Sequence, residues 1–290
     1  MRVHVRASRG SRLRARIRKE RVQSGKLAAA RATVFVLREP PLLRQAAGRV
    51  PQVLSARRVD RLDKLKQEIR RAHPDVKVHC AALDVRNKEN VDGVFRSLPE
   101  EFKDVDVLVN NAGLVFGVDH VLDVRKEEMD VMLDTNVKGL VYCTQAVLPR
   151  MKERNCGHII NLSSVAGKDP YAGGSVYCAT KHAVEAITKS LRLELLDTGI
   201  RVSSIAPGLV ETEFSVVRFR GDKAKADKVY EGLQSGPLTG QDIGVRTDGS
   251  HHRSFLSWRS LTWYTRRVLL QPRLLCSPRQ GRTTFKSPTC

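Results

Sequence analysis

The 290-residue sequence lacks features that mark several classes of protein. No apolar run approaches the length of about eighteen residues that a membrane-spanning helix needs, so no membrane partner is predicted. The six cysteines form no CxxC pair and no even framework, which indicates reduced thiols in a cytosol-like compartment. The pair His251-His252 has no neighbouring cysteine, and we predict no metal site there.

The net charge of the chain is +20, but its middle part contributes none of this excess. Residues 1–54 carry 14 Lys and Arg against 2 Asp and Glu, residues 244–290 carry 9 against 1, and the middle carries 28 of each sign. A strongly basic chain is typical of nucleic-acid binding. Here no aromatic platform or known binding motif accompanies the arginines, so we predict that nucleic acid is not a partner.

Short apolar runs alternate with amphipathic helical stretches from Val53 to Gln241, which predicts parallel β/α units. Continuous apolar strands of this kind need helices on both faces of the sheet. We therefore predict an α/β fold with a doubly wound parallel sheet. Strands are expected to end near Ser55 and to span Val76–Ala82, Val105–Val109, His158–Leu162 and Arg201–Ile205. Helices are expected at Asp60–Ala72, Lys88–Leu98, about Arg125 to Arg154, and Ser175–Leu196.

The two ends do not follow this pattern. Residues 1–31 hold nine arginines and are expected to form a disordered, solvated arm. A mitochondrial transit peptide is the alternative, since such peptides are rich in Arg and Ser and poor in acids. Residues 244–290 have no sustained apolar period and are expected to be disordered or loosely packed. One folded domain is therefore predicted over residues 32–243.

Tyr177 and Lys181 lie four residues apart in a predicted helix, so their side chains project from one helix face. A phenol with a pKa of about 10 is a poor acid-base catalyst near neutral pH, and a neighbouring ammonium favours the phenolate. Ser164, thirteen residues before Tyr177, offers a hydroxyl to a substrate oxygen. The three residues together indicate a proton-transfer site, although this Tyr–Lys spacing also occurs by chance on many helices.

Four further features accompany that pair. Asn110-Asn111-Ala112-Gly113 follows a predicted strand and would allow a nucleotide to approach closely. Asp84-Val85 follows another strand and offers a carboxylate to an adenine amino group. Arg57 and Arg58 would suit a ribose 2′-phosphate, which favours NADP over NAD. Asn136 places an amide where an apolar residue would pack better in the long helix. Each feature has an ordinary alternative, as a turn, a helix cap, a surface charge or a tolerated amide.

The sequence resembles the short-chain dehydrogenase/reductase family in motifs that occur in order between about Ser55 and Ile243: Asn-Asn-Ala-Gly at 110–113, Asn136, Ser163-Ser164, Tyr177 with Lys181, and Pro207-Gly208. The segment from Leu209 to Asp222 resembles the branch of NADP-dependent 3-hydroxy acid and serine dehydrogenases. The resemblance implies a Rossmann-like fold and a cytoplasmic oxidoreductase that transfers a hydride between NADP and a small hydroxy acid or alcohol. It also suggests a homodimer or homotetramer that packs through the long helix and the Tyr177 helix.

The resemblance implies a role for each motif residue. Tyr177 would be the general acid/base, and Lys181 would lower its pKa and hold the nicotinamide ribose. Ser164 would bind the developing carbonyl oxygen, and Asn136 would hold a water that links Lys181 to solvent. Arg218 would bind a substrate carboxylate bidentately. The other cofactor-binding residues would be Arg57, Arg58, Asp84, Val85, Asn111, Ala112, Gly113, Pro207, Gly208, Val210 and Thr212.

The family's glycine-rich turn is missing after the first strand, which is expected to begin at Thr33. Backbone N–H groups of such a turn hold the cofactor pyrophosphate at a helix N-terminus. Here the only glycine between Lys26 and Asp60 is Gly48, and Pro40-Pro41 has no N–H to donate.

The end of the family pattern is missing as well, because Arg- and Ser-rich sequence follows residue 243 where a helix and a last strand are expected. We therefore expect the first βα unit and the C-terminal strand to be degraded. We hypothesise that residues 37–53 and the residues from 244 onward are read out of frame or wrongly spliced. The alternative function is a fold-retaining scaffold, or a defective gene product, that lacks the cofactor loop.

Overall fold

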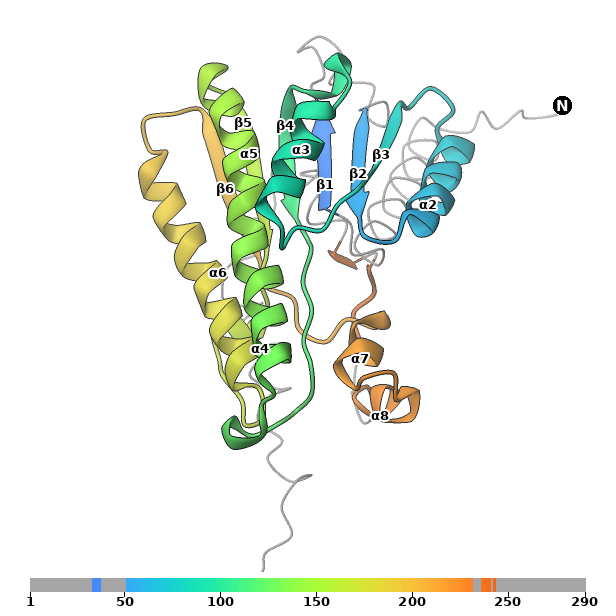
Figure 1. Cartoon of the computed structure of the whole chain (residues 1–290), viewed down its shortest axis with the longest axis vertical. Helices are drawn as coiled ribbons and strands as arrows, with labels where there is room; N and C mark the ends of the chain where they lie inside the picture. Colours follow the sequence, from blue (N-terminus) through green and yellow to red (C-terminus); the bar gives the residue numbers. More distant parts are fainter. Residues whose placement is uncertain (1–32, 38–50, 232–235, 241, 244–290) are drawn as a thin grey trace, which may run out of the picture. The chain divides into compact units, whose positions relative to one another are not determined.

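The computed structural model describes residues 33–37, 51–231, 236–240 and 242–243. These residues form a six-stranded sheet in the order β3-β2-β1-β4-β5-β6, with helices beside it (Figure 1). The expectations for residues 1–31 and 244–290, and the turn that follows the first strand, lie outside the described residues. Within the described part, no helix has the length and apolar character needed to cross a membrane.

The helices and strands lie close to the predicted positions, which confirms the predicted α/β fold class. The strands are β1 (Thr33–Leu37), β2 (Gln52–Ala56), β3 (Val78–Ala82), β4 (Val105–Asn110), β5 (Gly157–Leu162) and β6 (Ile200–Ile205). The α-helices are α2 (Val59–Ala72), α3 (Lys88–Ser97), α4 (Lys126–Leu133), α5 (Gly139–Glu153), α6 (Ser175–Glu194), α7 (Glu213–Arg218) and α8 (Lys223–Lys228). Short 3₁₀ turns are η2 (Glu100–Phe102), η3 (Val121–Asp123) and η5 (Val165–Gly167), and η4 (Asp134–Lys138) is a π-helical turn between α4 and α5.

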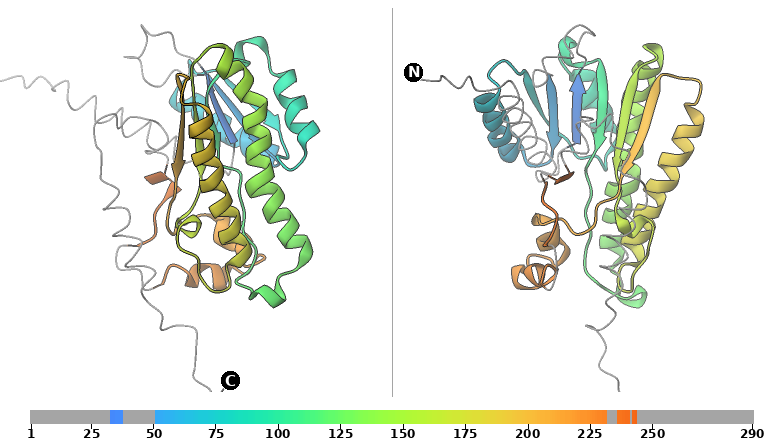
Figure 2. Two further views of the ribbon diagram at one scale, coloured as in Figure 1. Left: turned by 90° about the vertical axis from the view of Figure 1, so that its left-hand side faces the viewer. Right: turned by 180° about the vertical axis from the view of Figure 1, so that it is seen from behind.

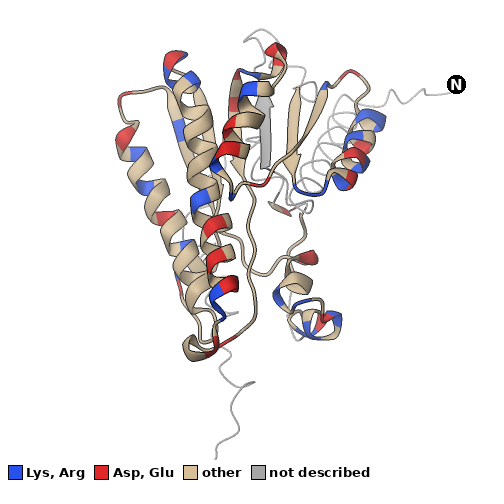
Figure 3. Cartoon of the chain, viewed as in Figure 1, with Lys and Arg blue, Asp and Glu red and all other residues tan. Residues whose placement is uncertain are grey.

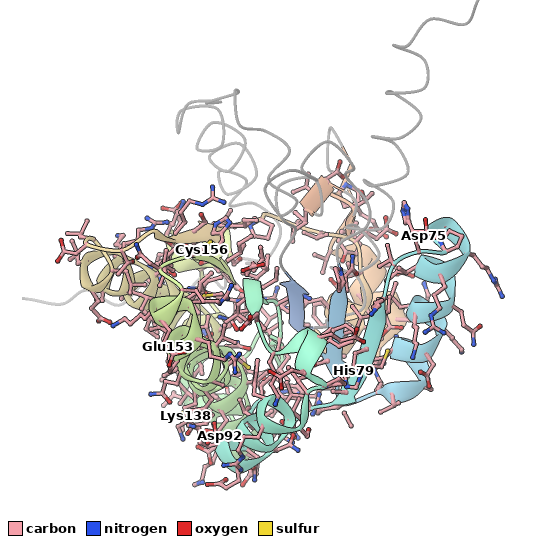
Figure 4. The ribbon with its side chains drawn as sticks, turned by 90° about the horizontal axis from the view of Figure 1, so that it is seen from above. Asp75, His79, Asp92, Lys138, Glu153 and Cys156 are labelled. Atoms are coloured by element: carbon pink, nitrogen blue, oxygen red, sulfur yellow. The ribbon has the colours of Figure 1, made fainter. Side chains whose placement is uncertain are left out.

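The sheet is covered on both faces, as a doubly wound fold requires. Successive residues of a strand point to opposite faces. On β2, Val53 joins the core beneath α3, α5 and α6, whereas Leu54 joins the core beneath α2. On β4, Leu108 and Val109 divide in the same way. The view from above (Figure 4) shows side chains filling the space between sheet and helices, with Asp75 and His79 at the α2–β3 end.

Charged side chains follow the outer faces of the helices. Lys, Arg, Asp and Glu alternate along α2, α4 and α5, while the strands are almost free of them (Figure 3). Several of these charges form pairs one helical turn apart, such as Lys88 with Asp92 and Lys126 with Asp130. Pairs of this kind each contribute only about 0.3–0.5 kcal/mol. Charges of both signs therefore lie together on the outer faces of these helices.

One strand differs from the predicted parallel sheet, because β1 runs antiparallel to both of its neighbours, β2 and β4 (Figure 2). Thr33 pairs with Ser55, and Leu37 pairs with Val105. The stretch from Thr33 to Ser55 holds 23 residues, fewer than the roughly 30 of a complete β-α-β unit. An antiparallel neighbour can be reached by a simple turn and needs no crossover helix.

The reversal of β1 changes which edge of the sheet its end faces. β4 and β2 end at Asn110 and Ala56, on the edge where ligands bind in open α/β sheets. β1 ends at Leu37 beside Val105, the first residue of β4, and therefore at the opposite edge. The last residue of β1, after which the family has its phosphate-binding turn, therefore lies away from that ligand edge.

The direction of β1 can be tested by cysteine cross-linking. Directly opposed residues of antiparallel strands have Cα atoms about 4.5–5.5 Å apart, a separation that a disulfide can span. We expect a Thr33→Cys, Ser55→Cys variant to cross-link on mild oxidation, and a Val36→Cys, Ser55→Cys variant not to do so. Peptide mapping by mass spectrometry distinguishes these links from links to native cysteines. The opposite pattern would show that β1 is parallel.

Candidate active site

The candidate site lies where β4, β5 and β6 end. The segments that follow β5 and β6 are joined by backbone hydrogen bonds: Ser163 N–H donates to Ile205 O at 2.8 Å, and Val165 N–H donates to Pro207 O at 3.0 Å. These bonds hold Ser164 beside the Pro207-Gly208 segment. The edge therefore brings together residues that are more than forty positions apart in the sequence.

Tyr177 and Lys181 lie on the face of α6 that is turned toward this edge. Both are buried, with exposed fractions of 7% and 5%. The Lys181 Nζ donates to Leu162 O at 2.8 Å and lies 5.9 Å from the centre of the Tyr177 ring. The one-turn spacing thus places both groups together, and Leu162, the last residue of β5, fixes the lysine.

Burial dominates the titration of both groups. It raises the pKa of Tyr177 above its usual value, and a hydrogen bond with Ser164 and the charge of Arg218 act in the opposite direction. Burial also lowers the pKa of Lys181 to about 8. In the free protein the cost of burying a phenolate outweighs the favourable contacts, and the lowering of the Tyr177 pKa by Lys181 stays a prediction.

Asn136 ties α6 to the loop that follows β4. It lies in the π turn η4 and is 2% exposed. Its Oδ1 accepts from Leu114 N–H at 2.9 Å, and its Nδ2 donates to Leu114 O at 2.8 Å and to Thr180 Oγ1 at 3.1 Å. A π turn inside a helix often marks a functional site. The water proposed for Asn136 stays a prediction.

Gly113 allows these groups to converge. A Cβ atom at this position would lie 3.4 Å from Asn136 Oδ1 and 3.6 Å from Lys181 Nζ. A side chain at Gly113 would therefore fill the space beside both polar groups. The predicted residues Asn136, Lys181 and Gly113 thus share one small region of the structure.

A pocket at the ends of β2 and β4 collects most of the residues predicted to bind adenosine. Arg57, Asp84, Val85, Ala112 and Gly113 line it together with Ser55 and Thr135. The Ser55 and Thr135 hydroxyls are buried and have no hydrogen-bond partner. Buried polar atoms are nearly always satisfied, so these two hydroxyls indicate a missing ligand or water. Neither residue was predicted from the sequence.

Two predicted cofactor residues have protein partners in the structure. Arg86 donates to both carboxylate oxygens of Asp84 and holds the pKa of that carboxyl below its usual range. Arg58 does not line the pocket but forms an ion pair with Glu213, 3.2 Å away. Asn111, the remaining predicted residue of the β4 loop, donates its backbone N–H to Val109 O at 3.0 Å.

The segment after β6 forms the remaining wall. Thr212 caps α7 by accepting from Phe214 N–H at 3.2 Å, and Val210 bridges to Leu238. Phe214 lies against the site, with its ring centre 5.9 Å from that of Tyr177. Around Gly208 there is open space. Figure 1 shows α7 and α8 beyond the edge where β4 and β6 end.

Arg218, the predicted carboxylate-binding residue, lies at the end of α7. Its Nε donates to Gly117 O at 3.2 Å, and its Nη2 donates to the Tyr171 hydroxyl. The guanidinium lies 5.3 Å from the centre of the Tyr171 ring. Arg218 thus joins α7 to the loops before η3 and before α6, close enough to Tyr177 for its charge to affect that phenol.

Sequence reasoning missed a buried polar network behind the site. The Asn110 Nδ2 donates to Thr144 Oγ1 at 3.2 Å and to Asn161 Oδ1 at 2.9 Å, and Asn161 Nδ2 donates to Thr188 Oγ1 at 2.9 Å. Tyr171 and Thr180 were also missed. Polar residues at buried positions of predicted strands, such as Asn161, were the available signal. The network joins β4 and β5 to α5 and α6, and it keeps the helices fixed behind the site.

Comparisons with known proteins agree with this geometry. The family described as short chain dehydrogenase matches residues 45–222. An NADP-dependent 3-hydroxy acid dehydrogenase of Schizosaccharomyces pombe is 48% identical over 195 residues, which are 67% of this chain and 74% of the relative. The NADP-dependent 3-hydroxy acid dehydrogenase YdfG of Salmonella typhi is 49% identical over 192 residues, 66% of this chain and 75% of the relative.

A solved structure is also similar. The closed form of serine dehydrogenase complexed with NADP⁺ has a TM-score of 0.66 and 44% sequence identity. The likeness covers 72% of this chain and 82% of that one.

Burial of Lys181 predicts a pH-dependent cost to stability. Its pKa falls from 10.5 to about 8 on folding, and each unit is worth about 1.4 kcal/mol, so the charged form destabilises the fold by about 3 kcal/mol. The cost is fully present below pH 8 and disappears as the pH rises toward 10.5. We expect Lys181→Met to raise the free energy of unfolding by about 1–3 kcal/mol at pH 7, and by less at pH 9.5, because the lost bond to Leu162 O offsets part of the gain.

Urea denaturation at the two pH values measures this effect. Lys189→Met is the matched control, because Lys189 lies on the same helix and is exposed. An equal change at both pH values, or a Lys181→Met variant that is less stable at pH 7, would contradict the prediction.

Proposed function

Because the chain belongs to the short-chain dehydrogenase family, we propose that it is an NADP-dependent oxidoreductase that interconverts a small hydroxy acid, or a similar alcohol, and its carbonyl form. The observation that carries this proposal is the position of buried Lys181, which lies near the Tyr177 ring and, together with Asn136, beside Gly113. The names of the relatives, which include NADP-dependent 3-hydroxy acid dehydrogenases, support the cofactor and the substrate class.

The residues at the edge of the sheet fit a dinucleotide in part. The unpartnered hydroxyls of Ser55 and Thr135 support a polar ligand in the adenosine pocket. NADP supplies or accepts the hydride when it is bound. Arg57 and Arg58 would hold the 2′-phosphate, and Tyr177 and Lys181 the nicotinamide ribose. The remaining contacts would come from Asp84, Val85, Asn111, Ala112, Gly113, Pro207, Gly208, Val210 and Thr212.

The catalytic residues would move one proton. Ser164 would hold the substrate oxygen, and Tyr177 would give its phenol proton to that oxygen during reduction, or take the proton during oxidation. The raised pKa of Tyr177 keeps the phenol protonated and therefore ready to act as an acid. Lys181, with a pKa of about 8, is an ammonium at neutral pH and would stabilise the phenolate once the proton has left. Proton transfer of this kind is worth about 10²–10⁴-fold in rate.

Arg218 would select substrates that carry a carboxylate. Its guanidinium is held by Gly117 O and the Tyr171 hydroxyl, so it is fixed before the substrate arrives. A planar, fixed guanidinium can bind both oxygens of a carboxylate. Its influence on Tyr177 indicates that it lies near the reacting groups.

A second candidate function is a scaffold that keeps the fold without turnover. The reversal of β1 favours it, because Leu37, the last residue of β1, lies at the edge of the sheet opposite the site. Hydrogen bonds to charged groups are each worth about 1.5–3 kcal/mol. Three missing bonds to a pyrophosphate would weaken cofactor binding by several orders of magnitude.

We also propose a homodimer or homotetramer that packs through α5 and α6. Large apolar side chains are exposed at the end of α6, with Leu193 69% and Leu196 73% exposed.

Among the described residues, Cys80, Cys143, Cys156 and Cys178 carry free thiols, which supports the proposal of a cytoplasmic protein.

The function is tested by titrating the purified chain with NADPH and by assaying 3-hydroxy acids. We expect micromolar binding in the wild type and in Tyr177→Phe. Turnover in Tyr177→Phe should fall by at least about 10²–10⁴-fold because the proton donor is lost. Fluorescence of the bound cofactor gives the affinity, and absorbance of NADPH gives the rate.

Tyr142→Phe is the control for this experiment, because Tyr142 lies on α5 and packs against the core away from the site. It should leave both quantities unchanged. A folded wild-type chain that binds no NADPH would favour the scaffold. Equal turnover in Tyr177→Phe and the wild type would reject the role of Tyr177.

Arg218→Lys tests the carboxylate-binding role. Lysine keeps the charge but loses the planar pair of donors. We expect KM for a 3-hydroxy acid to rise by about 10–100-fold, consistent with a loss of about 1.5–3 kcal/mol, while KM for a neutral secondary alcohol of the same length changes little. An equal rise for both substrates would show that Arg218 only positions the loop at Gly117.

A further inference from the structure

Glu213, at the start of α7, lies between two arginines at the start of α2. Its Oε2 accepts from Arg58 Nη2 at 3.2 Å, and its Oε1 accepts from Arg61 Nη1 at 2.5 Å. Arg58 precedes α2, Arg61 lies in the first turn of α2, and Glu213 is the first residue of α7. More than 150 positions of sequence separate the partners. The contact therefore joins the cofactor edge of the sheet to the wall above Tyr177.

The Glu213 carboxylate contacts an arginine that the proposed function assigns to a ribose 2′-phosphate. Arg58 directly follows Arg57, which lines the adenosine pocket, and the proposed function assigns both guanidinium groups to a ribose 2′-phosphate. A carboxylate and a phosphate bind the guanidinium in the same way, through parallel N–H···O bonds. Glu213 thus offers Arg58 the type of contact that the 2′-phosphate would offer.

The pair is exposed enough to exchange partners. The Arg58 and Glu213 side chains are each 46% exposed, and Arg61 is 38% exposed. Exposed ion pairs contribute little to stability, since water and salt screen both charges. A phosphate carries up to two negative charges and three acceptor oxygens, so it can displace a single carboxylate.

We propose that Glu213 is an internal competitor for the 2′-phosphate: it occupies Arg58 and Arg61 in the free protein and is displaced when a 2′-phosphorylated nucleotide binds. The proposal rests on the proposed function, because it requires the cofactor site to lie at this edge. Glu213 is then a specificity-determining residue that lowers the affinity for the phosphorylated cofactor without affecting the unphosphorylated form.

Displacement of Glu213 would leave the wall of the active site in place. Glu213 begins α7, and the next residue, Phe214, lies against Tyr177. The far end of α7 is held by separate contacts, in which Arg218 bonds Gly117 and the adjacent Arg220 pairs with Asp119 and Glu128. Release of Glu213 would break the contact between the first residue of α7 and α2, while the Thr212 cap and the contacts of Arg218 and Arg220 would hold α7 in place.

Calorimetric titration with two nucleotides tests the competition. 2′,5′-ADP carries the 2′-phosphate and 5′-ADP does not. In buffer of low ionic strength we expect Glu213→Gln to lower the Kd for 2′,5′-ADP by about five- to tenfold, because a charged competitor becomes neutral. The Kd for 5′-ADP should stay within about twofold, and the gain for 2′,5′-ADP should shrink in high salt.

Glu211→Gln is the matched control, because Glu211 is exposed, lies two residues away and loses the same charge. It should leave the ratio of the two Kd values unchanged. If the wild type prefers 2′,5′-ADP and Glu213→Gln does not strengthen that preference, the competition is rejected while the proposed function stands. If neither protein prefers 2′,5′-ADP over 5′-ADP, the assignment of the 2′-phosphate to Arg58 fails, and the competition fails with it.

Discussion

The side-chain amide of Asn136 is the contact on which the site depends. It pairs with both backbone groups of Leu114, in the way that a neighbouring strand would, and so holds the loop that leaves β4. Its third bond reaches Thr180, one residue before Lys181. One amide therefore fixes the distance between the adenosine side of the edge and the helix that carries Tyr177. Asn136 lies buried in the π turn η4, an irregularity that often marks a functional site.

The reacting groups are held at a cost to stability. Tyr177 and Lys181 are buried together, and burial shifts both pKa values toward the neutral forms. A lysine beside a phenol in solution favours the phenolate, so the spacing of Tyr177 and Lys181 predicts a lowered pKa for the phenol. In the free protein, desolvation raises the pKa of Tyr177 and outweighs the contacts that lower it. Protonated Tyr177 is the form that reduction needs, so burial prepares the acid and leaves Lys181 to stabilise the base.

The sequence predicted the parts of the fold that depend on local periodicity. The spacing of apolar residues determines which face of an element is buried, and this spacing is clear in α2 and α3 and in β4 and β5. The direction of β1 could not be predicted, because an apolar strand can pair with its neighbours in either direction. The direction depends on the connection to the next strand. Pairs such as Arg58 with Glu213 were also invisible, because the partners are far apart in the chain. No sequence pattern predicted Ser55 and Thr135 as site residues. Only the folded structure shows that their buried hydroxyls have no hydrogen-bond partner.

The reversal of β1 and the intact proton-transfer site affect different steps. The residues proposed for the two ends of the cofactor lie on β2, on the β4 loop and on α6, none of which is displaced by the direction of β1. The pyrophosphate between those ends is the part that a turn after β1 would hold. Losing contacts to a group that does not react weakens binding of substrate and transition state alike. The reversal should therefore weaken the affinity for the cofactor. The rate of proton transfer in a bound complex should still depend on Tyr177, Lys181 and Ser164.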